Sequence, residues 1–64
     1  MKNIIKQLRK ERAMRQEDMA QALGITRQAV IAIENDKYTP SLSLAMKIAR
    51  LLDTTIEALF TLED

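Results

Sequence analysis

The only glycine of the chain, Gly24, lies between two short segments in which apolar residues recur at helical spacing. Before it, Met19, Ala20 and Leu23 share one face of a helix that we expect over Gln16–Leu23. Glycine readily adopts the left-handed backbone conformation in which many helices end. The chain is therefore expected to stop one helix at this residue and to turn tightly into a second helix.

The second helix of this pair is expected to begin after Thr26, whose hydroxyl can accept a hydrogen bond from a free N–H of the first turn. Val30 and Ile33, three residues apart, would face inward and pack this helix onto the one before it. Two helices joined by a short turn cross steeply, and the small side chain of Ala20 suits their closest approach. The pattern predicts a helix-turn-helix over about residues 16–35.

Three more helices are expected, which makes the chain one all-α domain of five short helices over residues 1–64. Pro40 lacks a backbone N–H and disfavours helix at the residue before it, so a polar loop precedes the last two helices. Ser41 can cap the fourth helix, and either Thr54 or Thr55 can cap the fifth. The last four residues are either frayed or paired as a short strand with the first three. The three helices are placed at about Asn3–Ala13, at Leu42–Leu52 and in a short stretch that ends at Phe60.

Composition excludes several classes of function. The chain has no Cys and no His, so it lacks the residues of a disulfide framework, of the usual zinc sites and of most acid–base and thiol chemistry. We therefore expect no enzyme, no metal and no cofactor. No apolar run has the length of a membrane span or a signal peptide, and we expect a cytoplasmic protein with no membrane partner.

The net charge of +1 hides an uneven distribution. Residues 1–37 carry eight Lys/Arg and five Asp/Glu, a net of +3, whereas residues 38–64 carry two Lys/Arg and four Asp/Glu, a net of −2. A basic half favours an anionic partner.

The outward face of the second helix of the pair has side chains that suit DNA. Arg27 can bind guanine with two hydrogen bonds, Gln28 can bind adenine in the same way, and the methyl of Ala32 can touch that of thymine. The first residues of a recognition helix are the ones that reach base edges. The sequence therefore predicts a protein that reads double-stranded DNA in the major groove.

The whole pattern resembles the Xre/Cro-type helix-turn-helix family, which includes phage repressors and small bacterial regulators. The residues that carry this resemblance are Gln16, Ala20, Gly24, Val30 and Ile33 in register, with Ile33-Glu34-Asn35, Lys37-Tyr38-Thr39-Pro40-Ser41-Leu42, Ile56-Glu57 and Leu59-Phe60. It implies the five-helix fold of the lambda-repressor-like DNA-binding domains.

The resemblance also implies roles for individual residues. Gln16 would contact a phosphate and brace the base-reading side chains, and Thr26 would cap the recognition helix beside a phosphate. Tyr38 would join a phosphate clamp after that helix, or would pack its ring on the core instead. Phosphate contacts position a protein on DNA without reading its sequence. The full implied DNA-binding set is Gln16, Thr26, Arg27, Gln28, Ala32, Asn35, Lys37 and Tyr38.

Four residues depart from the family pattern. Arg15 stands where Ser or Thr usually caps the second helix, and such a cap contributes about 0.5–2 kcal/mol. Asp36 and Asp53 stand where glycine is usual, and Asp36 puts a negative charge into the phosphate-clamping loop. Ala32 replaces a residue that is often polar, so hydrogen-bonded readout would rest on the two side chains before it.

Two structural roles are expected as well. Arg9 and Glu34 should form an ion pair between the first and third helices, because Glu34 would repel phosphate and both flank core positions. Met14, Met19 and Met46 are expected to fill the core.

One such module spans about one half-site, so we expect a repressor that binds a two-fold operator as a homodimer. An antitoxin-like or partner-binding protein, or a module kept only for protein interaction, is the alternative. No part of the sequence indicates a small-molecule effector. The expected dimer contacts are the apolar residues near the chain ends: Ile4, Ile56, Phe60 and Leu62.

Overall fold

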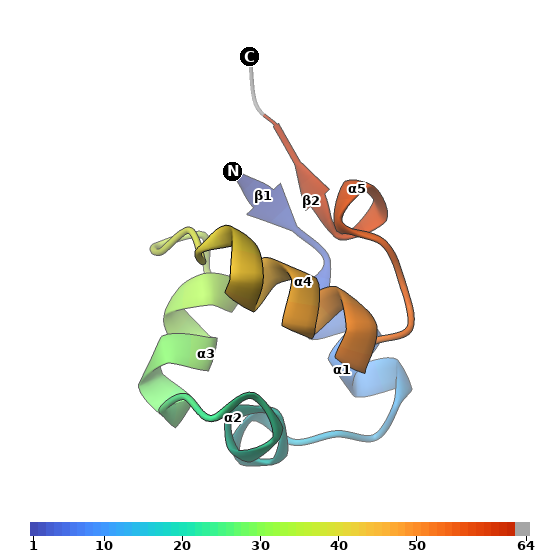
Figure 1. Cartoon of the computed structure of the whole chain (residues 1–64). Helices are drawn as coiled ribbons and strands as arrows, with labels where there is room; N and C mark the ends of the chain where they lie inside the picture. The colour runs from blue at the N-terminus through green and yellow to red at the C-terminus, as the bar shows by residue number, and fades with distance from the viewer. Residues whose placement is uncertain (63–64) are drawn as a thin grey trace.

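The computed structural model describes residues 1–62 and has five helices with one small antiparallel sheet (Figure 1). The expected five-helix fold is confirmed, and so is the pairing between the two ends of the chain. The elements in chain order are β1 (Lys2–Asn3), α1 (Ile5–Glu11), α2 (Gln16–Leu23), α3 (Arg27–Glu34), α4 (Leu42–Leu51), α5 (Ile56–Leu59) and β2 (Phe60–Thr61).

The sheet joins the chain ends at the far side of the molecule from α2 (Figure 1). Lys2 pairs with Thr61, and Asn3 pairs with Phe60. This pairing corrects two boundaries: α1 begins at Ile5 rather than Asn3, and Phe60 belongs to a strand rather than to the last helix. The other two residues of the expected tail, 63 and 64, lie outside the described residues.

The core lies where the helices meet, and every helix contributes to it. Seven large side chains are at most 2% exposed: Ile5, Met19, Val30, Ile33, Ile48, Leu52 and Leu59. Figure 1 shows α4 crossing in front of α1, between α3 and α5. The helix-turn-helix is thus held against a scaffold made by the rest of the chain.

Hydroxyl side chains cap three of the helices, as helix N-termini favour. Thr26 Oγ1 accepts from Ala29 N at 3.1 Å, and Ser41 Oγ accepts from Leu44 N at 3.2 Å. For the last helix the sequence left two candidates open. The structure uses Thr55, which accepts from the N–H of Ala58 at 3.1 Å.

One predicted core side chain is exposed instead, and for Tyr38 the structure excludes one of the two alternatives that the sequence left open. Met46 was predicted to fill the core, but it is 51% exposed on the outer face of α4. Tyr38 is 52% exposed, so its ring does not pack on the core. Of the other two predicted core methionines, Met19 is 1% exposed and Met14 packs partly buried against the core. The apolar stripe of α4 gave no sign that one edge of it lacks a covering element.

Candidate nucleic-acid interface

The turn between α2 and α3 depends on the backbone conformation of Gly24. Its φ is 71°, in the left-handed region, and its N–H donates to Gln21 O at 3.3 Å. Ile25 N donates to Ala20 O at 3.0 Å and closes the turn. A Cβ added at Gly24 would meet no atom within 4 Å, so the backbone angle rather than lack of space favours glycine here.

Packing of α3 onto α2 determines which side chains remain outside. Val30 and Ile33 are each 2% exposed and Ala20 is 5% exposed, so these residues form the contact between the two helices. Arg27 and Gln28 lie in the first turn of α3, and both are exposed. The structure therefore leaves both predicted base-reading side chains exposed at the start of α3.

The other predicted DNA-binding residues differ in exposure. Thr26 is exposed while its hydroxyl caps α3, and Ala32 is half-buried. After the helix, Asn35, Lys37 and Tyr38 are exposed in the loop that follows. Thr26 therefore lies at one end of α3, and the loop residues follow its other end.

A buried ion pair fixes α3 to α1, as the sequence predicted. Arg9 Nε lies 2.6 Å from Glu34 Oε2, and the two side chains are 7% and 1% exposed. Arg9 Nη1 also donates to Met14 O at 2.8 Å. The carboxylate thus holds the end of the recognition helix against the scaffold rather than facing DNA.

Gln16 joins this network through its side-chain amide. Its Nε2 donates to Glu34 Oε1 at 3.2 Å, and the residue is half-buried. An amide nitrogen has two N–H donors, and the hydrogen bond to Glu34 uses one of them. The contact ties Gln16 to Glu34 at the end of α3, whereas the resemblance implied bracing of the base-reading side chains at its start, and that role stays a prediction.

At the start of α2, Asp18 supplies one half of a capping box, although the Arg15 side chain caps no backbone N–H as Ser or Thr would. Its Oδ2 accepts from the backbone N–H of Arg15 at 3.0 Å and from Arg15 Nε at 3.1 Å. The hydrogen bond from the Arg15 guanidinium, with that from the backbone N–H, lowers the pKa of the Asp18 carboxyl. The same hydrogen bond and the nearby carboxylate raise the pKa of Arg15. The guanidinium is 74% exposed, beside the predicted phosphate contact.

Sequence reasoning missed Asn3, which links the terminal sheet to the loop after α3. Its Nδ2 donates to Ile33 O at 2.8 Å and to Asp36 Oδ1 at 3.0 Å, while its Oδ1 accepts from Ile5 N. Asp36 has a φ of 59°, the conformation that the usual glycine would adopt. The contact spans more than thirty residues of sequence, so no local pattern could reveal it.

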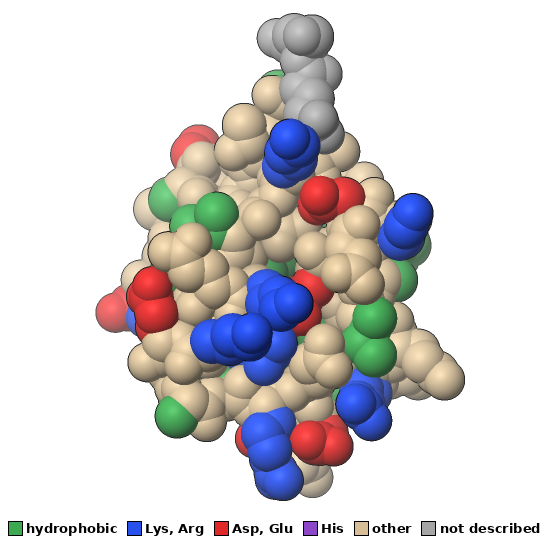
Figure 2. Space-filling view, turned by 180° about the vertical axis from the view of Figure 1, so that it is seen from behind, with side chains coloured by type: hydrophobic (Ala, Val, Ile, Leu, Met, Phe, Trp, Pro, Cys, Tyr) green, Lys and Arg blue, Asp and Glu red, His purple; other side chains and the backbone are tan. Residues whose placement is uncertain are grey.

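Charges of both signs are spread over the molecule. Figure 2, seen from behind α4, shows Lys and Arg side chains at the middle and around the rim of this face, with acidic side chains between them. In the part of the chain that is described, no group of three or more potential metal ligands lies together. No helix among residues 1–62 is long and apolar enough to cross a membrane.

Two short helices around a glycine turn, with exposed Arg and Gln at the start of the second, define a helix-turn-helix protein. Residues 5–59 match the helix-turn-helix family model, and the chain belongs to that family. The resemblance to Xre/Cro-type members is thereby confirmed. This is a family of DNA-binding transcriptional regulators and not of enzymes, so the match supports DNA binding in transcription regulation.

Known proteins similar to this chain carry names that agree with the family. An HTH-type transcriptional regulator of Methanocaldococcus jannaschii is 50% identical over 64 residues, which cover all of this chain and 97% of that protein. The regulator YgzD of Bacillus subtilis is 44% identical over 64 residues, with the same coverage of both chains. The ImmF control region 10 kDa protein of Bacillus phage phi105 is 39% identical over 56 residues, or 88% of this chain and 62% of that protein.

Proposed function

We propose that this protein is a sequence-specific transcriptional regulator that represses by placing α3 in the major groove of an operator. The observation that carries the proposal is the joint exposure of Arg27 and Gln28 in the first turn of a helix whose start is fixed by the Thr26 cap. Arg donors match the acceptors of guanine, and the Gln amide matches adenine. The proposal places the protein in the cytoplasm, with double-stranded DNA as its partner.

Phosphate contacts would hold this helix in register. Gln16 would donate from the start of α2, where the exposed Arg15 guanidinium is paired with the carboxylates of Asp18 and Glu17. Beyond the end of α3, Asn35, Lys37 and Tyr38 would contact the backbone of the DNA from the exposed loop. Such contacts add affinity that falls steeply with salt but little sequence preference.

The test is selection of bound sites from random double-stranded DNA, followed by affinity measurements on the selected site. Each bidentate base contact discriminates by about 1–3 kcal/mol, so Arg27→Ala and Gln28→Ala should each relax the preference at one position by about 5- to 150-fold. Lys47→Ala, which changes an exposed residue of α4, is the matched control and should keep the wild-type site preference. Unchanged base preference in both α3 variants would contradict the proposed readout.

We also propose that the protein acts as a homodimer, because one recognition helix covers only about one half-site. Two of the predicted contact residues, Ile4 and Leu62, are 39% and 77% exposed. The other two, Ile56 and Phe60, are half-buried and pack against the core. They lie around the terminal sheet and α5, away from the exposed side of α3 (Figure 1).

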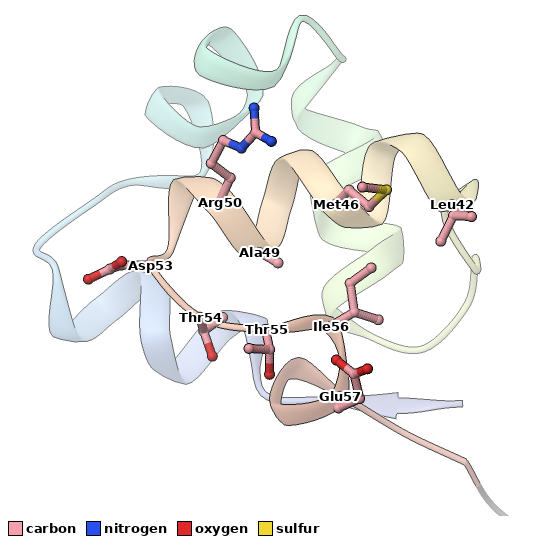
Figure 3. Close-up of a pocket in the computed structure, with 9 residues that line it drawn as sticks. All are labelled: Leu42, Met46, Ala49, Arg50, Asp53, Thr54, Thr55, Ile56 and Glu57. Atoms are coloured by element: carbon pink, nitrogen blue, oxygen red, sulfur yellow. The ribbon is translucent and has the colours of Figure 1, made fainter.

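The exposed apolar surface continues from α5 onto α4. Leu42 is 70% exposed and Met46 is 51% exposed, and both line a groove with Ile56. Figure 3 shows Ile56 pointing from the start of α5 toward α4, with Arg50 and Glu57 at the edges of the groove. In a two-fold contact each of these charges can meet its opposite on the second copy. We therefore add Leu42 and Met46 to the proposed dimer surface.

Sedimentation equilibrium tests the dimer. Leu62→Glu and Met46→Glu should each shift the protein toward monomer and weaken binding to a two-half-site operator far more than to a single half-site. Ala22→Glu changes an exposed residue of α2 and should leave the association state as in the wild type. A wild-type protein that stays monomeric at high micromolar concentration and on its operator would contradict the dimer. An antitoxin-like or partner-binding protein would use the same surface for a different chain.

A further inference from the structure

We infer that Ile31 is a third base-reading residue, which contacts the C5 methyl group of a thymine in the major groove. The inference rests on the proposed function and extends it. It assigns a DNA contact to an apolar side chain in the middle of α3 that the sequence patterns left without a role.

The position of Ile31 on the helix places it between the two polar reading residues. With about 100° between successive residues, Ile31 lies roughly 40° from Arg27 and roughly 60° from Gln28. The same spacing puts it roughly 130° from the mean direction of the buried residues Val30 and Ile33. Ile31 therefore belongs to the outward face of α3, nearer to its centre than Arg27.

Burial agrees with this position. Val30 and Ile33, on either side of Ile31 in the sequence, are each 2% exposed, whereas Ile31 is only half-buried, as is Ala32. Among the described residues, Ile31 is not one of the partly buried apolar side chains that pack against the core, although Ile25 and Leu23 are. Isoleucine is also a weaker helix former than alanine or leucine. Neither core packing nor helix propensity thus accounts for an isoleucine at this position.

The chemistry of the major groove does account for it. Thymine is the only one of the four bases to display a methyl group there, and apolar side chains read that group by contact. Ile31 lies on the same face as two side chains that suit guanine and adenine, so the thymine would belong to the same half-site. Ala32 lies on the other side of Gln28 by the same helical spacing, is half-buried, and has only a single methyl to extend.

The test is a double-mutant cycle, in which one change removes the methyl group from the DNA and the other removes the alkyl group from the protein. After selection of the operator, each thymine of a half-site is replaced in turn by uracil, which differs only by that methyl. One replacement should weaken wild-type binding about three- to fivefold, the effect of burying roughly one methyl group. In Ile31→Ala the same replacement should have no effect. Arg27→Ala is the matched control: it should lose preference elsewhere and keep the full uracil effect.

The outcomes separate the inference from the function on which it rests. If wild-type protein binds a selected site but no uracil replacement weakens it, or if Ile31→Ala keeps the loss, the inference is overturned and the proposed function stands. If the wild type binds no DNA at low salt, the proposed function itself fails. Ile31→Val provides a second variant that retains a branched alkyl group, and it should keep most of the uracil effect. Thermal unfolding by circular dichroism checks that all variants are folded.

Discussion

Glu34 is 1% exposed in its side chain, and its charge is balanced by the Arg9 guanidinium at 2.6 Å. Removing one partner of a buried pair leaves the other charge without compensation, which destabilises by about 3–5 kcal/mol. We therefore expect Arg9→Ala to lower the free energy of unfolding by an amount of that size in urea denaturation. The loss would be large for a 64-residue chain, since small domains have little stability in reserve.

Two controls separate the charge from the shape of this site. The double variant Arg9→Met with Glu34→Leu removes both charges, and it should lose far less stability than Arg9→Ala alone. Lys10→Ala, at the neighbouring exposed position, should stay within about 0.5 kcal/mol of the wild type. A single variant as stable as the double variant would show that the carboxylate tolerates burial without the guanidinium.

Ala13 has a φ of 53°, although alanine has no side-chain means of stabilising the left-handed conformation. That conformation costs an L-residue with a Cβ about 1–2 kcal/mol. Glycine avoids this cost but loses about 0.5–1 kcal/mol through chain entropy. Ala13→Gly should therefore raise the free energy of unfolding by up to about 1 kcal/mol. The same change at Ala22, inside α2, should lower it by about 0.5–1 kcal/mol, so opposite signs in chemical denaturation are the expected result.

At the scale of the element, the start of α2 predicts a dependence on pH. The Arg15 guanidinium and backbone N–H lower the pKa of Asp18 in the folded protein. Folding is therefore stabilised by the ionised carboxylate at pH values above the unfolded pKa of about 3.9. That contribution is lost as the pH falls from there through the folded pKa. Asp18→Asn should have a lower free energy of unfolding than the wild type at neutral pH. As the pH falls below about 4, its free energy of unfolding should decrease less than that of the wild type.

Removal of the other partner provides the control. Arg15→Gln removes the guanidinium that is the main cause of the lowered Asp18 pKa. Like Asp18→Asn, it should reduce the loss of stability at acid pH. High salt should weaken the wild-type effect, because the pair is exposed. If the stability of Asp18→Asn depended on acid pH as that of the wild type does, the titrating group would be another residue.

The elements themselves differ in how far local sequence determines them. The helix-turn-helix was predicted to within a residue, because Gly24, the Thr26 cap and the apolar spacing are all local signals. Asn3 was expected in a helix but is in a strand, since its partner Phe60 lies at the other end of the chain. Phe60 left the last helix for the same reason. Periodicity cannot indicate a pairing whose two halves are so far apart.

In the candidate site, too, some features follow from local sequence and others only from contacts between distant residues. The exposure of Arg27 and Gln28 follows from the buried spacing of Val30 and Ile33, which the sequence displays directly. The contact of Gln16 with Glu34 was not predicted, because it depends on how α2 packs against the end of α3. The exposure of Met46 needed knowledge that α5 is only four residues long and leaves part of α4 uncovered.

Across the whole molecule, charges of both signs are interspersed (Figure 2). Residues 1–37, with a net charge of +3, hold the helix-turn-helix, whereas residues 38–62, which hold α4 and α5, carry two Lys/Arg and two Asp/Glu and have no net charge. Asp36 is an exception, because it places a carboxylate in the loop after α3. Its counterpart Asp53 follows α4, at the end of that helix away from α3 (Figure 1).

These two aspartates form a matched pair that tests which side of the molecule meets DNA. Their φ values are 59° and 55°, and asparagine tolerates this conformation as well as aspartate does. Asp36→Asn and Asp53→Asn thus make the same change in net charge with little backbone strain. Asn keeps the side-chain oxygen that accepts from Asn3 at position 36.

A unit charge about 4 Å from a phosphate in water interacts by about 1 kcal/mol. Asp36→Asn should therefore strengthen DNA binding by up to about fivefold at low salt, with a smaller gain at high salt. Asp53→Asn should change the affinity by less than twofold under the same conditions. Equal gains in both variants would mean that total charge, rather than the α3 side of the molecule, governs the encounter with DNA.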